Sequence, residues 1–297
     1  MKKIVITGGA GFVGTKLAEA LLARGYSVHV LDRGEPRIKH SALAYTVCDT
    51  TQSVPADVLD GAYGVINLAG KTIGEHWTKQ VKQDIRNSRI QTTHNLVDAI
   101  SATRLPPTVL VSASAVGYYG NTGEKYVDEL SPAGGDFLAT VARDWETEVR
   151  RAEVFGVRVA HIRTAHVIGA GGLVASLAKV FKKHLGGYFG SGRQYMPWVS
   201  IDDIVNIYIF LLEHPSASGP YNTGAGAPLS QKSFMRTFAR ARGYWPVWWI
   251  PAFTARLVLG EFAESLLTGQ RVSSDKLRKL GYVFKYEKLE EVLKGGK

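Results

Sequence analysis

Three glycines near the N-terminus have the spacing of a diphosphate-binding turn. Gly8, Gly11 and Gly14 give the pattern G-x-x-G-x-x-G, which follows an apolar run at residues 3–7 and opens a helix-periodic segment at residues 12–23. The first glycine permits a tight turn, the second lets the backbone approach a pyrophosphate, and the third lets helix and strand pack closely. Amide groups at the helix N-terminus favour the negative charge. The alternative is that the glycines serve only the turn. We predict a bound nicotinamide dinucleotide, contacted by Thr7, Gly8, Gly11, Phe12, Val13 and Gly14.

An acidic and a basic residue follow each other at the end of the second expected strand. Asp32 lies 18 residues beyond Gly14. A carboxylate at this point accepts hydrogen bonds from the adenosine ribose hydroxyls and favours NAD. Arg33 instead suits a 2′-phosphate, which favours NADP, unless it is only a surface charge. The predicted cofactor is therefore NAD or NADP, and Asp32 slightly favours NAD.

The elements that must position these residues alternate between short apolar runs and longer amphipathic segments. This rhythm predicts a Rossmann-type, doubly wound parallel α/β sheet. We expect helices at 12–23, 78–102, 136–155 and about 252–267, and six strands at 3–7, 27–31, 44–48, 64–68, 108–112 and 157–163. Beyond residue 165 the rhythm breaks. We therefore expect an NAD(P)-binding domain of residues 1–165 plus roughly 197–224, and a smaller C-terminal substrate lobe of residues 166–196 and 225–297.

Composition narrows the class of protein and its partners. The 297 residues are 45% hydrophobic, and 36 Lys and Arg outnumber 26 Asp and Glu, for a net charge of +10. The cations are scattered, so we expect no nucleic-acid partner. A single cysteine, Cys48, suits a reducing compartment, and no signal peptide or spanning apolar run is visible. We expect a cytoplasmic protein, monomer or homodimer, with no membrane partner and no metal site. Its partner would be a small-molecule substrate, of which an anionic or nucleotide-linked compound is one option.

Segments along nearly the whole chain carry a family resemblance. They include Asn67-Leu68-Ala69-Gly70, Ser88-Arg89, Ser112 to Gly120, Gly219 to Asn222 and Gly269 to Val272. With the glycine turn, they resemble the extended short-chain dehydrogenase/reductase superfamily. The detail is most similar to an atypical branch, the NAD-dependent epimerase/dehydratase-like "epimerase family". That branch includes the human family 39U protein and carries a C-terminal domain of unknown function.

The resemblance implies further site residues. Asp49 would contact the adenine edge, although a strand-end turn is an equal alternative. Leu68, Ala69 and Gly70 would line the cofactor cleft, and Ser112 would lie beside the nicotinamide. Ser114 aligns with the superfamily's catalytic serine. Arg163 would lie near the cofactor, or would form a structural salt bridge.

The catalytic pair of the superfamily is missing. Its dehydrogenases use a tyrosine and, four residues later, a lysine on the helix after the fifth strand. Here residues 136–146 contain neither, and Leu138 and Ala142 take their places. Tyr118 or Tyr119 could supply the acid, or the two could merely shape the loop. Weaker candidates are His166, Asp136 and Lys125.

Two functions follow. The first is an NAD(P)-linked oxidoreductase or epimerase of unknown substrate. The second is a non-catalytic NAD(P)(H) sensor or regulatory module, for which a link to cell division is one option. In the C-terminal lobe, Arg271 and Lys276 could face an anionic substrate or could simply be solvated. The aromatic stretch at residues 244–251 would suggest a partner or membrane interface if exposed, but we expect it to pack the lobe onto the sheet.

Overall fold

A single parallel sheet forms the centre of the computed structural model, which describes residues 1–295. It has seven strands in the order β11-β7-β5-β4-β1-β2-β3, and every neighbouring pair is parallel. The chain starts in the middle and winds outwards in both directions, with the reversal between β1 and β4. The predicted doubly wound Rossmann-type fold is therefore confirmed. The strands are β1 (Lys3–Thr7), β2 (Ser27–Asp32), β3 (Leu43–Val47), β4 (Gly64–Asn67), β5 (Val109–Ala115), β7 (Arg158–Thr164) and β11 (Gly219–Asn222).

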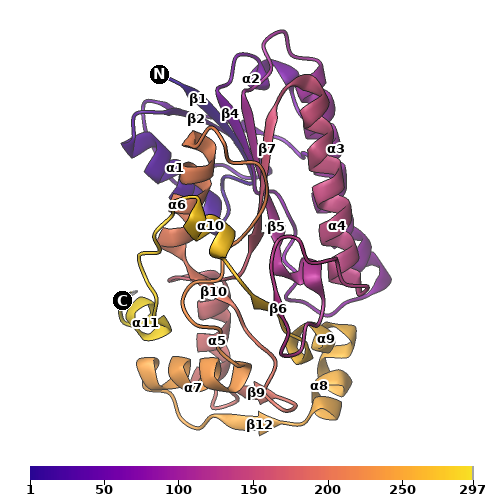
Figure 1. Cartoon of the computed structure of the whole chain (residues 1–297), viewed down its shortest axis with the longest axis vertical. Coiled ribbons are helices and arrows are strands. Elements are labelled where there is room, and N and C mark those ends of the chain that lie inside the picture. The colour runs from indigo at the N-terminus through magenta and orange to yellow at the C-terminus, as the bar shows by residue number, and fades with distance from the viewer. Residues whose placement is uncertain (296–297) are drawn as a thin grey trace.

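Alternating side chains of the central strand enter two separate cores. Ile4 and Ile6 belong to one hydrophobic cluster and Val5 belongs to the other, and all three are fully buried. This is the period-two alternation of a strand covered on both faces. Helices α1 (Phe12–Ala23) and α6 (Ile201–Glu213) supply the first core. Helices α3 (Lys79–Ser101) and α4 (Phe137–Arg150) supply the second, and Figure 1 shows these two helices side by side along one flank.

Capping residues set where the two long helices begin. The side chain of Thr78 accepts a hydrogen bond from the Val81 amide, and Asp136 accepts one from the Ala139 amide. Such caps satisfy amides that have no partner inside the helix. The expected helices at 78–102 and 136–155 agree with α3 and with α4 plus the 3-10 turn η2 (Arg151–Phe155). The short helix α2 (Ala56–Leu59) precedes β4.

Two expectations about elements are wrong. The strand β11 was not expected, because a four-residue run with a glycine and a proline lacks a strand pattern; it forms at the sheet edge, where proline is tolerated. The helix expected after residue 252 is broken into α8 (Ala252–Leu259), η3 (Gly260–Phe262) and α9 (Ala263–Leu267). Gly260 has φ +59°, which no helix interior accommodates.

The remaining elements gather beyond the carboxyl edge of the sheet, and α5, α7, β9, β12 and α8 form the end opposite the N-terminus (Figure 1). They include three two-stranded parallel pairs, β10–β8, β12–β9 and β13–β6. Their strands are β6 (Tyr126–Val127), β8 (His166–Ile168), β9 (Gly187–Phe189), β10 (Trp198–Ser200), β12 (Trp248–Ile250) and β13 (Arg271–Val272). The helices are α5 (Gly172–Lys182), α7 (Gln231–Arg242), α10 (Asp275–Lys279) and α11 (Leu289–Gly295).

The expectation that the aromatic stretch at 244–251 packs the lobe is wrong for its tryptophans. Trp245, Trp248 and Trp249 are each more than half exposed, whereas Tyr244 is half-buried. Separately, within residues 1–295 we find no helix with the length and apolar character needed to cross a bilayer.

Candidate functional site

The glycine turn is held by close backbone contacts on both sides. Gly8 has φ +72°, and a Cβ there would lie 2.8 Å from the amide nitrogen of Ala69. A Cβ on Gly14 would lie 2.4 Å from the carbonyl oxygen of Gly8. A Cβ on Gly11 would meet only that same oxygen, at 3.2 Å. Gly8 and Gly14 therefore hold β1, α1 and the loop after β4 together, while Gly11 lies on the open side of the turn.

Helix α1 begins directly after this turn with no side-chain cap. Its N-cap residue is Gly11, so no side-chain oxygen accepts from the first-turn amides. Those amides and the helix dipole form a site that suits an anion. The ring of Phe12 packs under the glycine segment after β8, where a Cβ on Gly171 would lie 2.8 Å from it. The neighbouring Val13 is half-buried. Phe12 therefore joins the turn to the glycine segment that follows β8.

At the adenosine end of the expected site, acidic and basic groups lie together. Asp32 accepts hydrogen bonds from the amides of Ala10 at 2.9 Å and Gly34 at 3.4 Å. Arg33 is exposed. Asp49 accepts from the amide and hydroxyl of Thr51, and those bonds, with a smaller contribution from Arg33, lower the pKa of Asp49. Asp32 and Arg33, expected from the sequence as the alternative partners of a ribose and a 2′-phosphate, thus follow each other at the end of β2.

Asn67 connects the carboxyl ends of three neighbouring strands. Its Oδ1 accepts from the Thr7 hydroxyl at 2.6 Å. Its Nδ2 donates to Thr93 at 2.9 Å and to the Ser112 hydroxyl at 3.2 Å. The side chains of Thr7 and Ser112 are fully buried, so their hydroxyls fix the strand ends. Next along the chain, Leu68 and Ala69 are half-buried and Gly70 is exposed.

Arg89 is a largely buried cation beside that loop. Its guanidinium donates to the carbonyl oxygens of Ile85 and Lys71, both at 3.0 Å. A Cβ on Gly70 would lie 3.3 Å from its Cζ. Burial lowers the pKa of Arg89 to about 10. Among residues 1–295, no carboxylate forms an ion pair with it, so its charge is not neutralised by the protein.

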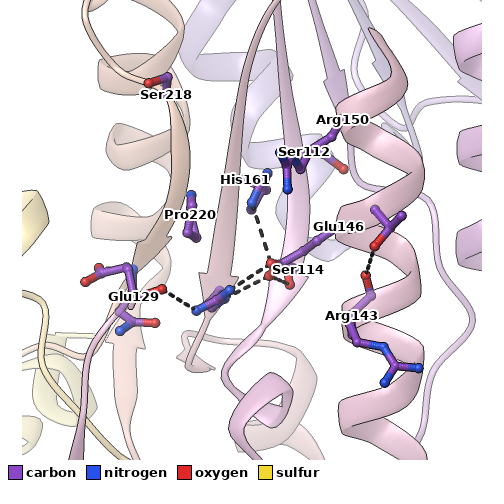
Figure 2. A network of polar contacts seen from close by, with 12 residues as sticks. Ser112, Ser114, Glu129, Arg143, Glu146, Arg150, His161, Ser218 and Pro220 are labelled. Atoms are coloured by element: carbon purple, nitrogen blue, oxygen red, sulfur yellow. Dashed lines mark hydrogen bonds and ion pairs between the residues drawn. The ribbon is translucent and has the colours of Figure 1, made fainter. Parts of the chain in front are cut away.

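Ser114 belongs to a buried polar network rather than to an open surface. Its hydroxyl donates to Glu146 Oε1 at 2.6 Å. The same carboxylate accepts from Arg163 Nε and Nη2, each at 2.8 Å. Figure 2 shows Glu146 reaching from α4 between Ser114 and His161. Arg163 therefore has the structural salt bridge that the sequence analysis gave as an alternative.

The two tyrosines of η1 (Val116–Tyr119) differ in their surroundings. The Tyr119 hydroxyl accepts from Arg163 Nη1 at 2.8 Å and donates to Asn222 Oδ1 at 2.9 Å. Burial raises the pKa of Tyr119 to about 12, against the opposing effect of Arg163. The ring of Tyr118 stacks on the Arg163 guanidinium, with Cζ 3.5 Å from its centroid. Tyr118 is only half-buried, and its hydroxyl makes no hydrogen bond to residues 1–295.

His161 shares the Glu146 network and is a buried titratable group. Its Nε2 lies 3.5 Å from Glu146 Oε2, and its Nδ1 has no hydrogen-bond partner in the described part of the chain. Burial lowers the pKa of His161 to about 4, which outweighs the raising effect of Glu146. This imidazole is therefore neutral at pH 7.

The weaker catalytic candidates are dispersed. Asp136 caps α4, and Lys125 is exposed on a loop. His166 begins β8 with an exposed side chain. Helix α4 reads FLATVARDWETEVR, without tyrosine or lysine. Over residues 1–295, no three His, Cys, Asp or Glu side chains are grouped as metal ligands would be.

The two cations singled out in the C-terminal lobe lie apart from the glycine turn. Lys276 donates to the carbonyl oxygens of Ser218 at 3.1 Å and Pro220 at 2.8 Å. It lines a cavity of about 870 Å³ to which no residue of the turn contributes. Arg271 lies over the rings of Tyr126 and Tyr195, at 4.0 and 4.9 Å.

Comparison with known proteins decides the family. A profile described as "NAD dependent epimerase/dehydratase family" matches residues 4–224, which is well over half of the chain. The chain belongs to the NAD dependent epimerase/dehydratase family. Residues 250–295 match a second profile, a domain of unknown function (DUF1731). Both parts of the resemblance noted in the sequence are thereby confirmed.

Within the NAD dependent epimerase/dehydratase family, similar proteins cover the chain from end to end. It is 35% identical to the chloroplastic SDR39U1 homolog of Arabidopsis thaliana, over 98% of this chain and 85% of that protein. It is also 35% identical to an epimerase family protein of Staphylococcus haemolyticus, over 98% of this chain and 97% of that protein. The crystal structure of human epimerase family protein SDR39U1 with NADPH is 28% identical, with a TM-score of 0.86 over 99% of this chain and 98% of that one.

Two residues of this family member were not assigned a role from the sequence. Arg89 lies in the Ser88-Arg89 segment of the resemblance, but nothing in its spacing indicates that it lacks an acidic partner. His161 is a buried residue of the strand predicted at 157–163. A polar residue inside an apolar run is the sequence feature that could have indicated a buried polar contact. Both depend on contacts between α3, α4 and the sheet that only the folded chain reveals.

Proposed function

We propose that this chain binds NADP(H) or NAD(H) on the glycine turn and acts as an epimerase/dehydratase-type oxidoreductase on a small molecule. The observation that carries the proposal is the contact of Gly14 with Gly8, where an added Cβ would lie 2.4 Å from the carbonyl oxygen. This contact brings the uncapped start of α1 to the carboxyl edge of the sheet. Ligands of doubly wound folds bind at that edge, where the strand order reverses.

NADP(H) is the cofactor that the adenosine end favours. Both oxygens of Asp32 accept backbone amides, at 2.9 and 3.4 Å, so the carboxylate helps to hold the turn. Arg33 is exposed beside it, and among residues 1–295 no carboxylate forms an ion pair with it. An exposed guanidinium suits a 2′-phosphate. The human relative was solved with NADPH, which supports the same choice.

Tyr118 is the group we assign to proton transfer. A bound nicotinamide supplies or accepts hydride at carbon, so the protein must supply or accept a proton at the substrate oxygen. The Tyr119 hydroxyl is already bonded to Arg163 and Asn222, and the Ser114 hydroxyl to Glu146. The half-buried Tyr118 keeps its phenol unbonded within the described chain. Its ring is held on Arg163, and the residue lies in η1, directly after the end of β5.

A non-catalytic NAD(P)(H) sensor is the second candidate function. The composition of helix α4 favours it. By the resemblance drawn from the sequence, Leu138 and Ala142 take the places of the superfamily's tyrosine and lysine, and neither side chain transfers a proton. Helix α4 contains no tyrosine or lysine elsewhere. A sensor would need only the turn and a surface that responds to the bound nucleotide.

Fluorescence titration with NADPH and NADH tests the binding step. The wild type should bind NADPH more tightly than NADH. Arg33→Ala should weaken NADPH binding by about tenfold or more, which is the contribution of one charge-assisted hydrogen bond, and should leave NADH binding unchanged. Gly11→Asp places a negative charge on the open side of the turn and should reduce the affinity for both. Gly34→Ala is the control, because nothing lies within 4 Å of its added Cβ. Unchanged affinity in Gly11→Asp would overturn the proposed site.

Turnover separates the two candidate functions. Purified protein with NADPH or NADP is incubated with nucleotide sugars and small carbonyl compounds, and nicotinamide absorbance is followed. A change that depends on Tyr118 supports the enzyme. Tight cofactor binding with no turnover, together with a protein partner captured only in the presence of cofactor, would favour the sensor.

A further inference from the structure

One end of the molecule presents large apolar side chains to solvent. Figure 1 places β12 and α8, which carry most of them, at the end of the molecule opposite the N-terminus. We call six residues the tryptophan patch: Trp245, Trp248, Trp249, Phe253, Leu257 and Val258. The exposed fraction of each is more than half, from 53% for Trp248 to 83% for Leu257. So many large exposed apolar side chains within one short segment mark an interaction surface rather than ordinary surface scatter.

The patch is held in a fixed arrangement. The indole of Trp248 donates to the carbonyl oxygen of His184, and that of Trp249 donates to the carbonyl oxygen of Gly190, both at 2.7 Å. The backbone beneath them is the parallel pair β12–β9. Because the polar N–H groups are bonded to the protein, the apolar parts of both rings are free to enter an apolar environment without leaving a donor unsatisfied.

The chain around the patch is strongly basic. Residues 173–193 and 231–260 contribute nine Lys and Arg and no Asp or Glu to this end of the molecule. One of the nine, Arg256, is paired with Glu264 of the neighbouring helix α9. Lys182, Lys183 and Arg240 are exposed. His184, next to this lysine pair, contacts the carbonyl oxygen of Trp245 at 2.9 Å, so the pair lies beside the patch.

This combination of charge and apolar surface favours one occupant. A second copy of the chain, joined about a two-fold axis, would bring the same cations together, and like charges repel. An anionic bilayer complements both features, since its lipid headgroups attract lysine and arginine while tryptophan partitions into the interface. We propose that the tryptophan patch binds the surface of an anionic lipid membrane, with its aromatic side chains inserted among the headgroups.

This inference departs from the sequence-based expectation of no membrane partner, because that expectation placed the tryptophans inside the lobe. It is independent of the proposed cofactor site, since no residue of the glycine turn takes part. The protein would lie on the membrane and not across it.

Vesicle sedimentation tests the proposal. The full chain should sediment with phosphatidylcholine vesicles that contain phosphatidylglycerol, should remain free with phosphatidylcholine alone, and should be released by high salt. Lys182→Ser with Lys183→Ser should weaken binding by roughly fivefold for each cation removed. Binding of equal strength to neutral vesicles, or no binding to anionic vesicles at low salt, would overturn it.

The apolar contribution is tested with two pairs of variants. Trp248→Ser with Trp249→Ser should weaken binding by about tenfold or more. If that pair disturbs folding, as judged by circular dichroism, Phe253→Ser with Leu257→Ser takes its place. Leu105→Ser with Leu130→Ser is the matched control, because both leucines are exposed outside the patch, and it should bind as the wild type does. Equal loss in the control pair would overturn the assignment to the patch.

Tryptophan fluorescence reports insertion directly. Three of the six tryptophans, Trp77, Trp145 and Trp198, are buried, so quenching by brominated lipid reports the other three. Quenching that is absent when the protein is bound would contradict insertion. A dimer that the patch variants abolish, with no vesicle binding, would assign the patch to a second copy and also overturn the proposal.

Discussion

Glu146 and Arg163 form a bidentate ion pair in the interior, with Oε1 2.8 Å from Nε and Oε2 2.8 Å from Nη2. Their side chains are only 9% and 3% exposed. The pair joins α4 to β7, and through Tyr119 and Asn222 it reaches the edge strand β11. It therefore fixes the helix after β5 relative to the strand ends that carry the candidate site.

Removing one member of this pair should be costly. Glu146→Ala leaves the Arg163 charge buried and the Ser114 hydroxyl without its acceptor. We expect a loss of about 3–5 kcal/mol in the free energy of unfolding, measured by urea denaturation. Glu19→Ala, which breaks an exposed pair with Lys16, should cost less than about 1 kcal/mol. Similar losses in both variants would show that the interior network does not hold the fold.

The two tyrosines of η1 should separate stability from turnover. Tyr119→Phe removes the hydrogen bonds that the buried hydroxyl makes with Arg163 Nη1 and Asn222 Oδ1, and should cost about 1–3 kcal/mol. Tyr118→Phe keeps the ring on Arg163 and should change stability by less than about 0.5 kcal/mol. If Tyr118 transfers the proton, this change lowers kcat by roughly 100-fold or more on any substrate found. Full activity in Tyr118→Phe would remove it from the mechanism.

Arg89 should matter for nucleotide binding more than for folding. Its charge has no carboxylate partner in residues 1–295, so Arg89→Met removes an unpaired cation and should leave stability unchanged or raise it. We expect the same variant to weaken binding of the anionic cofactor by about tenfold. Arg86→Met is the matched control on the same helix, because Arg86 pairs with Asp144. Equal affinities in the two variants would argue against a role for Arg89 in the site.

The Rossmann-type sheet could be predicted because its signals are local. The glycine turn sits between an apolar strand and an amphipathic helix, and the expected β1 and α1 have the same bounds as the observed ones. Asp32, expected at the end of the second strand, is likewise the last residue of β2. Periodicity and turn chemistry are written in neighbouring residues, so no tertiary information is needed.

The features that the sequence did not predict depend on contacts between distant segments. Gly219-Pro220-Tyr221-Asn222 becomes a strand only because it pairs with β7 at the sheet edge. The tryptophans at 245–249 suggest a core by composition, but the residues beneath them are already packed, with Phe181 stacked on Tyr244 at 5.6 Å. The Glu146 network could not be predicted either, since it joins β5, α4, β7, η1 and β11, and its members Tyr119 and Asn222 lie 103 positions apart in sequence.

His161 should make the folded protein sensitive to acid. Its pKa is about 4 in the folded chain, because burial opposes the charged form, against an ordinary value of 6.5. Glu146 faces it and opposes this shift, while Arg163, Lys276 and Arg150 reinforce it. Between these pKa values the unfolded chain binds a proton that the folded protein does not. Stability therefore falls as pH decreases from 6.5 towards 4.

The size of this effect follows from the two pKa values. Between pH 7 and pH 5 the His161 contribution should decrease by about 2 kcal/mol. Urea unfolding of the wild type and of His161→Leu at both pH values isolates it, because His29, His166 and the other titrating groups are common to both proteins. The wild type should lose about 2 kcal/mol more than the variant over this range. An identical pH dependence in the two proteins would show that His161 is solvated or protonated in the folded state.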